Sequence, residues 1–68
     1  MEIVTSKYRH PEIKSGQHVN GPESIFVREN ESSDWHLVHD IRSQYAVRKL
    51  VEKIGLRMFL GKFCTRVL

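Results

Sequence analysis

The 68-residue chain is poor in cysteine, proline and tryptophan, and it has no long apolar run. Its single cysteine cannot form an internal disulfide, and no CxxC pair is present. No segment approaches the roughly 18 apolar residues of a membrane-spanning helix, and no charged-then-apolar signal segment stands at the start. We therefore expect a protein of a reducing, cytoplasmic compartment. We do not expect a membrane to be among its partners.

Motifs that carry catalysis or bind metals are also missing. The sequence has no phosphate-binding glycine loop, no nucleophile elbow and no paired-carboxylate motif. The histidines and the cysteine show no ligand pair at zinc-like spacing: His10, His18, His36, His39 and Cys64. A cysteine within an apolar stripe is typical of a small buried side chain. We predict a protein that is not an enzyme, with no catalytic residues, no metal site and no cofactor.

Length and composition indicate one small globular domain over residues 1–68. A chain of this size buries only about 60% of its unfolded surface, so a dimer or a larger assembly is expected to add stability. Hydrophobic residues make up 40% and charged residues 28% of the chain, which is typical of a folded domain.

Charge is unevenly distributed along the chain, although the total is only +3. Residues 1–41 carry four basic and seven acidic side chains, a net charge of −3. Residues 42–68 carry seven basic side chains and one acidic side chain, a net charge of +6. This asymmetry indicates a basic surface on the C-terminal half of the protein.

The first 23 residues are predicted to be loosely ordered or irregular. Ile3 and Val4 are compatible with a brief strand, but turn-forming residues follow at Pro11, Ser15-Gly16 and Asn20-Gly21-Pro22.

Two runs rich in β-branched and aromatic residues, 24–28 and 35–39, predict a β-hairpin around the polar segment 29–34. In the alternative, a helix begins at Ser33 or Asp34 and the fold is mostly α. We expect an α+β fold in which the hairpin packs on two C-terminal helices.

Two apolar stripes predict these helices. The first comprises Ala46, Val47, Leu50, Val51 and Ile54, and the second comprises Leu56, Phe59, Leu60, Phe63, Cys64 and Val67. At about 100° per residue the stripes centre roughly 160° apart, so one straight helix could not bury both. A break at Gly55, in the left-handed conformation that ends helices, turns both stripes inward. Ser43 is the predicted cap of the first helix, and the second is predicted to reach about Val67.

The segment around Gly55 resembles the DNA-binding helix-turn-helix pattern over about twenty residues. Leu50, Ile54, Gly55 and Leu56 stand where that pattern has apolar, apolar, glycine and apolar residues. Val51 replaces the usual small residue, and Gly61 replaces the branched apolar residue that locks the second helix. The two departures favour an ordinary helical hairpin.

Basic side chains lie away from both stripes, and we predict a basic, non-enzymatic module whose C-terminal helices bind nucleic acid or another acidic surface. The predicted contact residues are Arg48, Lys49, Lys53, Arg57, Lys62 and Arg66. In a second interpretation, this surface is neutralised by the acidic N-terminal half or simply solvated.

The runner-up function is a protein-interaction or assembly adaptor that uses the apolar face of the last helix. The hairpin offers few inward residues to cover both helices: Ile25, Val27, Trp35 and Leu37. The excess apolar surface predicts a homodimer or a hetero-complex. The predicted interface residues are Leu56, Phe59, Leu60, Phe63 and Val67.

Overall fold

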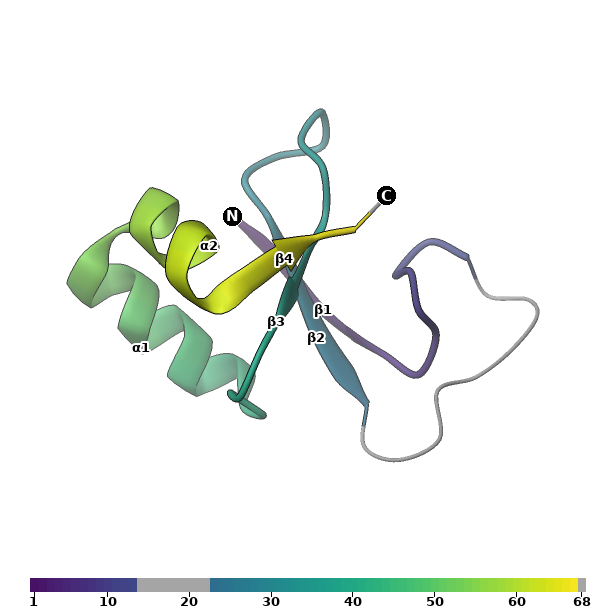
Figure 1. Ribbon diagram of the computed structural model, residues 1–68, viewed down its shortest axis with the longest axis horizontal. Helices are drawn as coiled ribbons and strands as arrows, with labels where there is room; N and C mark the ends of the chain where they lie inside the picture. The colour runs from purple at the N-terminus through teal and green to yellow at the C-terminus, as the bar shows by residue number, and fades with distance from the viewer. Residues whose placement is uncertain (14–22, 68) are drawn as a thin grey trace.

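A computed structural model describes residues 1–13 and 23–67 of the chain (Figure 1). Its elements are, in order, β1 (Glu2–Ser6), β2 (Ser24–Arg28), β3 (His36–Val38), α1 (Gln44–Ile54), α2 (Leu56–Phe63) and β4 (Cys64–Arg66). The predicted α+β fold, a hairpin packed on two C-terminal helices, is confirmed. The mostly-α alternative is wrong, because the chain after Trp35 forms a strand that pairs on both sides.

The four strands form one antiparallel sheet in the order β1-β2-β3-β4. Strand β1 pairs with β2 along its whole length, from Glu2 opposite Arg28 to Ser6 opposite Ser24. The brief strand expected near Ile3 is therefore present, at the start of the segment predicted to be irregular. Residues 14–22 of that segment, with the turn predicted at 20–22, lie outside the described residues.

The last strand, β4, replaces the end of the second predicted helix. That helix ends at Phe63 instead of near Val67. Cys64 then pairs with Val38, and the Val67 N–H donates a hydrogen bond to the Trp35 carbonyl at 2.9 Å. The prediction that residues 64–67 are helical is wrong, because strand formation satisfies backbone groups at the edge of β3 that a longer helix would leave unpaired.

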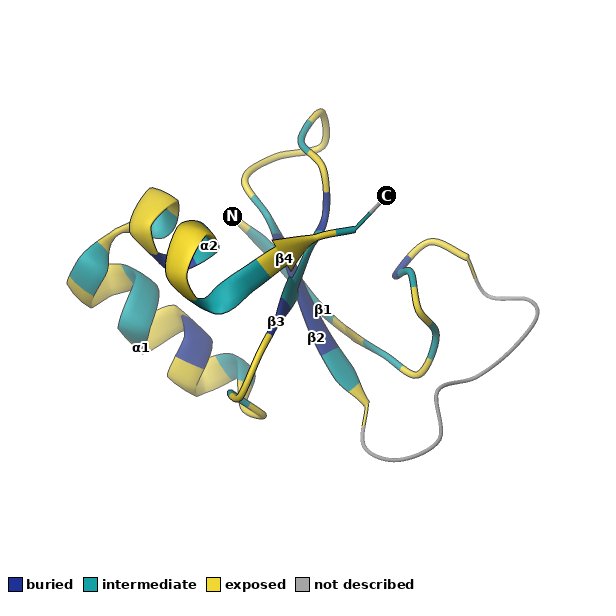
Figure 2. Cartoon of the chain, viewed as in Figure 1, coloured by how far each residue is buried: buried dark blue, intermediate teal, exposed yellow. Residues whose placement is uncertain are grey.

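Both helices cover the same face of the sheet. In Figure 1 they lie to the left of the strands, whereas residues 7–13 lie to the right. The core between helices and sheet consists of Ile25, Val27, Val38, Val47 and Phe59. Figure 2 shows this burial concentrated on β2 and on the inward faces of the helices.

Strand register decides which hairpin residues face the helices. Phe26 pairs with Leu37, and Val27 pairs with His36, so side chains alternate between the two faces from these fixed points. Leu37 and Trp35 therefore share the helix-free face with Phe26. The expectation that Trp35 and Leu37 cover the helices is wrong.

The break between the helices falls at Gly55, as predicted. Gly55 has φ 88° and ψ 151°, which is an extended conformation with positive φ that only glycine adopts readily, and not the left-handed helical one that we expected. The Ser43 side chain accepts a hydrogen bond from the Ala46 N–H at 3.3 Å, which confirms the predicted cap of α1. Ala46 itself is exposed and does not belong to the buried stripe.

Candidate anion-binding surface

The apolar residues of α1 and α2 fix the direction of their basic side chains. Val47 and Phe59 are buried against the sheet, so positions about half a turn away on each helix face outward. Five of the six predicted contact residues lie on the outward faces and are exposed: Arg48, Lys49, Lys53, Arg57 and Lys62. The sixth, Arg66, is exposed on β4.

Few of these cations are paired. Lys49 Nζ lies 3.8 Å from Glu52 Oε2 on the same helix, and Arg66 Nη1 lies 3.6 Å from Asp34 Oδ2. Within residues 1–13 and 23–67, the other basic side chains of the C-terminal half form no ion pair: Arg42, Arg48, Lys53, Arg57 and Lys62. The outward faces of both helices therefore keep most of their positive charge.

Two acidic side chains of the N-terminal half form ion pairs away from the helices. Arg28 binds Glu2 through Nη2 at 2.9 Å and Glu12 through Nη1 at 3.2 Å, on the helix-free side of the sheet. In the described part of the chain, a single ion pair joins the acidic half to the basic half, that of Asp34 with Arg66. Neutralisation of the two helices by the acidic half therefore has no support among the described residues. The other part of the second interpretation, a surface that is simply solvated, stays a prediction.

An aromatic side chain that is not among the six predicted contact residues also lies on this surface. Tyr45 is 70% exposed, and Lys49 Nζ lies 5.4 Å from the centroid of its ring. The sequence could have predicted this place, because Tyr45 stands one turn before Lys49 and away from the apolar stripe. Met58, which follows Arg57 on α2 and stands one turn before Lys62, is 51% exposed.

The predicted interface residues do not form one exposed stripe. Phe59 is fully buried within the single chain, with its ring centroid 5.6 Å from that of Phe63. Leu56 and Leu60 are partly buried against the same core, whereas Val67 lines the helix-free face. Ile3, Val38 and Ile41 also cover this core, in addition to two of the hairpin residues that were predicted to do so. Self-association through the remaining edge of α2 stays a prediction.

The histidines make separate local contacts. His10 Nδ1 accepts a hydrogen bond from the Glu12 N–H at 3.1 Å, His36 Nδ1 lies 3.1 Å from the Asp34 carbonyl oxygen, and His39 Nε2 contacts Thr65 Oγ1. His18 lies outside the described residues. In the part of the chain that the structure describes, no three His, Cys, Asp or Glu side chains are grouped to hold a metal ion.

Cys64 lies on the helix-facing side of β4, opposite Val38. Burial raises the pKa of its thiol to about 11, which agrees with the role of a small apolar side chain. None of the helices in the described regions is both long and apolar enough to cross a membrane.

The helical pair differs from a helix-turn-helix in its connection. A turn of three or four residues joins the helices of that motif, whereas Gly55 alone separates α1 from α2. Compared with known proteins, the chain matches no family model, no curated protein and no solved structure.

Proposed function

We propose that the protein is a non-enzymatic module that binds nucleic acid through the outward faces of α1 and α2. The observation that carries this proposal is the set of exposed cations without an ion pair among the described residues. Those on the two helices are Arg48, Lys53, Arg57 and Lys62. Basic side chains of this kind bind phosphates and release condensed counterions, without reading sequence.

The exposed ring of Tyr45 favours single strands over duplexes. Unpaired bases can stack on an accessible aromatic ring, and the neighbouring Lys49 can hold the adjacent phosphate. Duplex bases are stacked on one another and do not offer their faces to a side chain on a helix surface.

Fluorescence anisotropy with labelled single strands and duplexes, titrated at low and moderate salt, tests the proposal. The affinity for single strands should fall linearly with salt on logarithmic axes, with a slope of about −0.7 for each neutralised phosphate. The variant Arg48→Gln/Lys53→Gln should reduce the magnitude of that slope by about 1.4 if each residue neutralises one phosphate.

The matched control is Lys7→Gln/Arg9→Gln, which removes the same charge from exposed residues outside the helices. Its slope should equal that of the parent protein. Equal losses in the two variants would show that total charge, and not the helical surface, causes binding. Absence of binding at low salt would overturn the proposal.

Tyr45→Ala should weaken single-strand binding by about 1–3 kcal/mol, the range measured for base–aromatic stacking. Tyr45→Phe keeps the ring and should bind like the parent protein. Equal affinities for the alanine and phenylalanine variants would remove stacking from the proposal but leave the phosphate contacts.

A further inference from the structure

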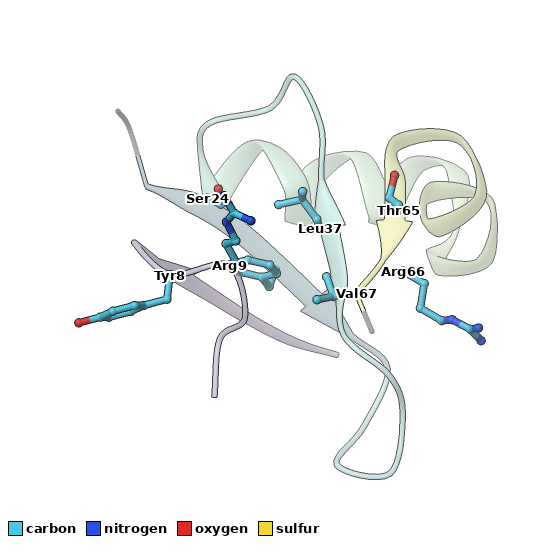
Figure 3. Close-up of a pocket in the computed structure, with 8 residues that line it drawn as sticks. Tyr8, Arg9, Ser24, Leu37, Thr65, Arg66 and Val67 are labelled. Atoms are coloured by element: carbon cyan, nitrogen blue, oxygen red, sulfur yellow. The ribbon is translucent and has the colours of Figure 1, made fainter. Parts of the chain in front are cut away.

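A groove of about 360 Å³ lies on the helix-free face of the sheet, and Figure 3 shows it with the helices behind the strands. Strand register builds its floor. Phe26 pairs with Leu37, and Leu37 pairs with Thr65, so three adjacent strands present these side chains to one side. Val67, two residues after Thr65, returns to the same face and also lines the groove. The volume is in the range of small-molecule sites.

The floor of this groove is apolar and partly accessible. Phe26 is only 1% exposed, whereas Leu37 and Val67 are half-buried and offer their side chains to a ligand. The Phe26 ring is covered, and Tyr8, the other aromatic residue that lines the groove, extends away from Leu37 and Val67 in Figure 3. Neither ring therefore offers a platform beside that apolar floor on which a nucleic-acid base could stack. A compact apolar body that contacts Leu37 and Val67 fits this surface better.

The charge around the groove is positive. None of the described residues that line it is acidic. In Figure 3 Arg9 lies between Tyr8 and Leu37, and it forms no ion pair with any described residue. Arg66 also lines the groove, but its side chain extends away in the figure and its guanidinium pairs with Asp34. Among the described lining residues, Arg9 is therefore the cation that is available to a ligand.

We propose that this groove binds a small anion with an apolar body, of the aromatic carboxylate or sulfonate class. The aromatic body covers Leu37 and Val67, and the anionic group pairs with the Arg9 guanidinium. This site lies on the opposite face of the sheet from the basic helices, so it is independent of the proposed nucleic-acid surface.

Two fluorescent probes with the same aromatic body test the role of charge. These are 8-anilinonaphthalene-1-sulfonate, which is an anion, and N-phenyl-1-naphthylamine, which lacks the sulfonate. The full-length protein should bind the sulfonate saturably with one site per chain. The neutral probe should bind about fivefold to tenfold more weakly, since an ion pair of this kind contributes an energy of that order. Equal affinities for the two probes would overturn the proposal.

Single substitutions locate the site. Arg9→Gln should lower the affinity for the sulfonate probe by about fivefold to tenfold and leave the affinity for the neutral probe unchanged. Lys7→Gln, which removes the same charge from a neighbouring exposed residue, should leave both affinities unchanged. Leu37→Ser and Val67→Ser should each lower the affinity for both probes. If one of these variants fails to fold, the other still tests the site. Equal effects of Arg9→Gln and Lys7→Gln would contradict the assignment.

Two controls separate this site from other sources of probe binding. Loosely packed states also bind anilinonaphthalene sulfonate, so the near-ultraviolet circular dichroism of Trp35 should stay unchanged as the probe binds. Binding that appears only as this signal is lost would overturn the proposal. Arg48→Gln/Lys53→Gln and an added single-stranded oligonucleotide should leave sulfonate binding unchanged. Competition by the oligonucleotide would assign the groove to nucleic acid instead, whereas failure of nucleic-acid binding alone would leave the groove proposal intact.

Discussion

The guanidinium carbon of Arg28 lies 4.3 Å from the centroid of the Trp35 ring. From this position Arg28 reaches Glu2 and Glu12, and the Trp35 Nε1–H donates to the same Glu12 oxygen at 2.9 Å. One side chain therefore joins the start of β1, the segment after it and the approach to β3 on the helix-free face.

Arg28→Lys should lower the midpoint of urea-induced unfolding. A lysine ammonium has no planar fork that can bind two carboxylates while it stacks on Trp35. The control is Arg57→Lys, at an exposed residue with no ion pair among those described, and its midpoint should stay at the parent value. Equal midpoints for the two variants would contradict a structural role of Arg28.

Stability should fall at acid pH as Glu12 becomes protonated. The hydrogen bond from Trp35, helped by the charge of Arg28, lowers the pKa of Glu12 below its ordinary value of 4.5. Because the folded pKa is the lower one, this contribution to stability is present above about pH 4.5 and is lost as pH falls through the folded pKa.

Trp35 fluorescence followed through the acid range measures this titration directly. Glu12→Gln should remove the transition, and Trp35→Phe, followed by NMR of the Glu12 carboxyl, should return the pKa of Glu12 toward its ordinary value. A Glu12 titration that does not respond to loss of Trp35 would assign the shift to another cause.

Substitution by alanine should change the free energy of unfolding in opposite directions at Gly55, between the helices, and at Gly61, within α2. Gly55→Ala should destabilise the fold by about 1–3 kcal/mol, because alanine is strained at φ 88° although no atom lies within 4 Å of the added methyl group. Gly61→Ala, exposed within α2 and equally free of contacts, should stabilise it by about 0.5–1 kcal/mol. Chemical denaturation of both variants measures the two changes in the free energy of unfolding. Changes of the same sign would be inconsistent with the break at Gly55.

Cys64 should react slowly with alkylating agents. Only the thiolate reacts, and burial raises its pKa from 9.0 to about 11, so alkylation by iodoacetamide near neutral pH should be about a hundredfold slower than for a free thiol. The rate should rise with pH until about pH 11. If the pH dependence of the alkylation rate had its midpoint near pH 9, the thiol would be open to water.

The same shift predicts a loss of stability at alkaline pH. Because the folded pKa is the higher one, the contribution of the protonated thiol is fully present below about pH 9 and is lost as pH rises toward about 11. Cys64→Ala should lose less stability over this interval than the parent protein. Parallel pH profiles of the two proteins would contradict the assignment to Cys64.

Local sequence signals were sufficient for the elements whose stability is largely local. The β-branched run at 24–28, the hydroxyl of Ser43 and the glycine at position 55 each act on the backbone within a few residues, and each was located correctly. The outward placement of the basic side chains also follows from helical periodicity, because it needs only the spacing of Arg48 and Lys53 from the apolar stripe.

The remaining features depend on contacts between residues far apart in the sequence. Cys64 and Val67 continue the spacing of a helix, and only the open edge of β3 makes a strand more favourable there. The pairing of Phe26 with Leu37 sends Trp35 and Leu37 away from the helices, and it thereby creates the groove beside Arg9. A one-residue change of register would reverse every one of these side chains, and register is set by the assembled sheet and its core, not by any single strand.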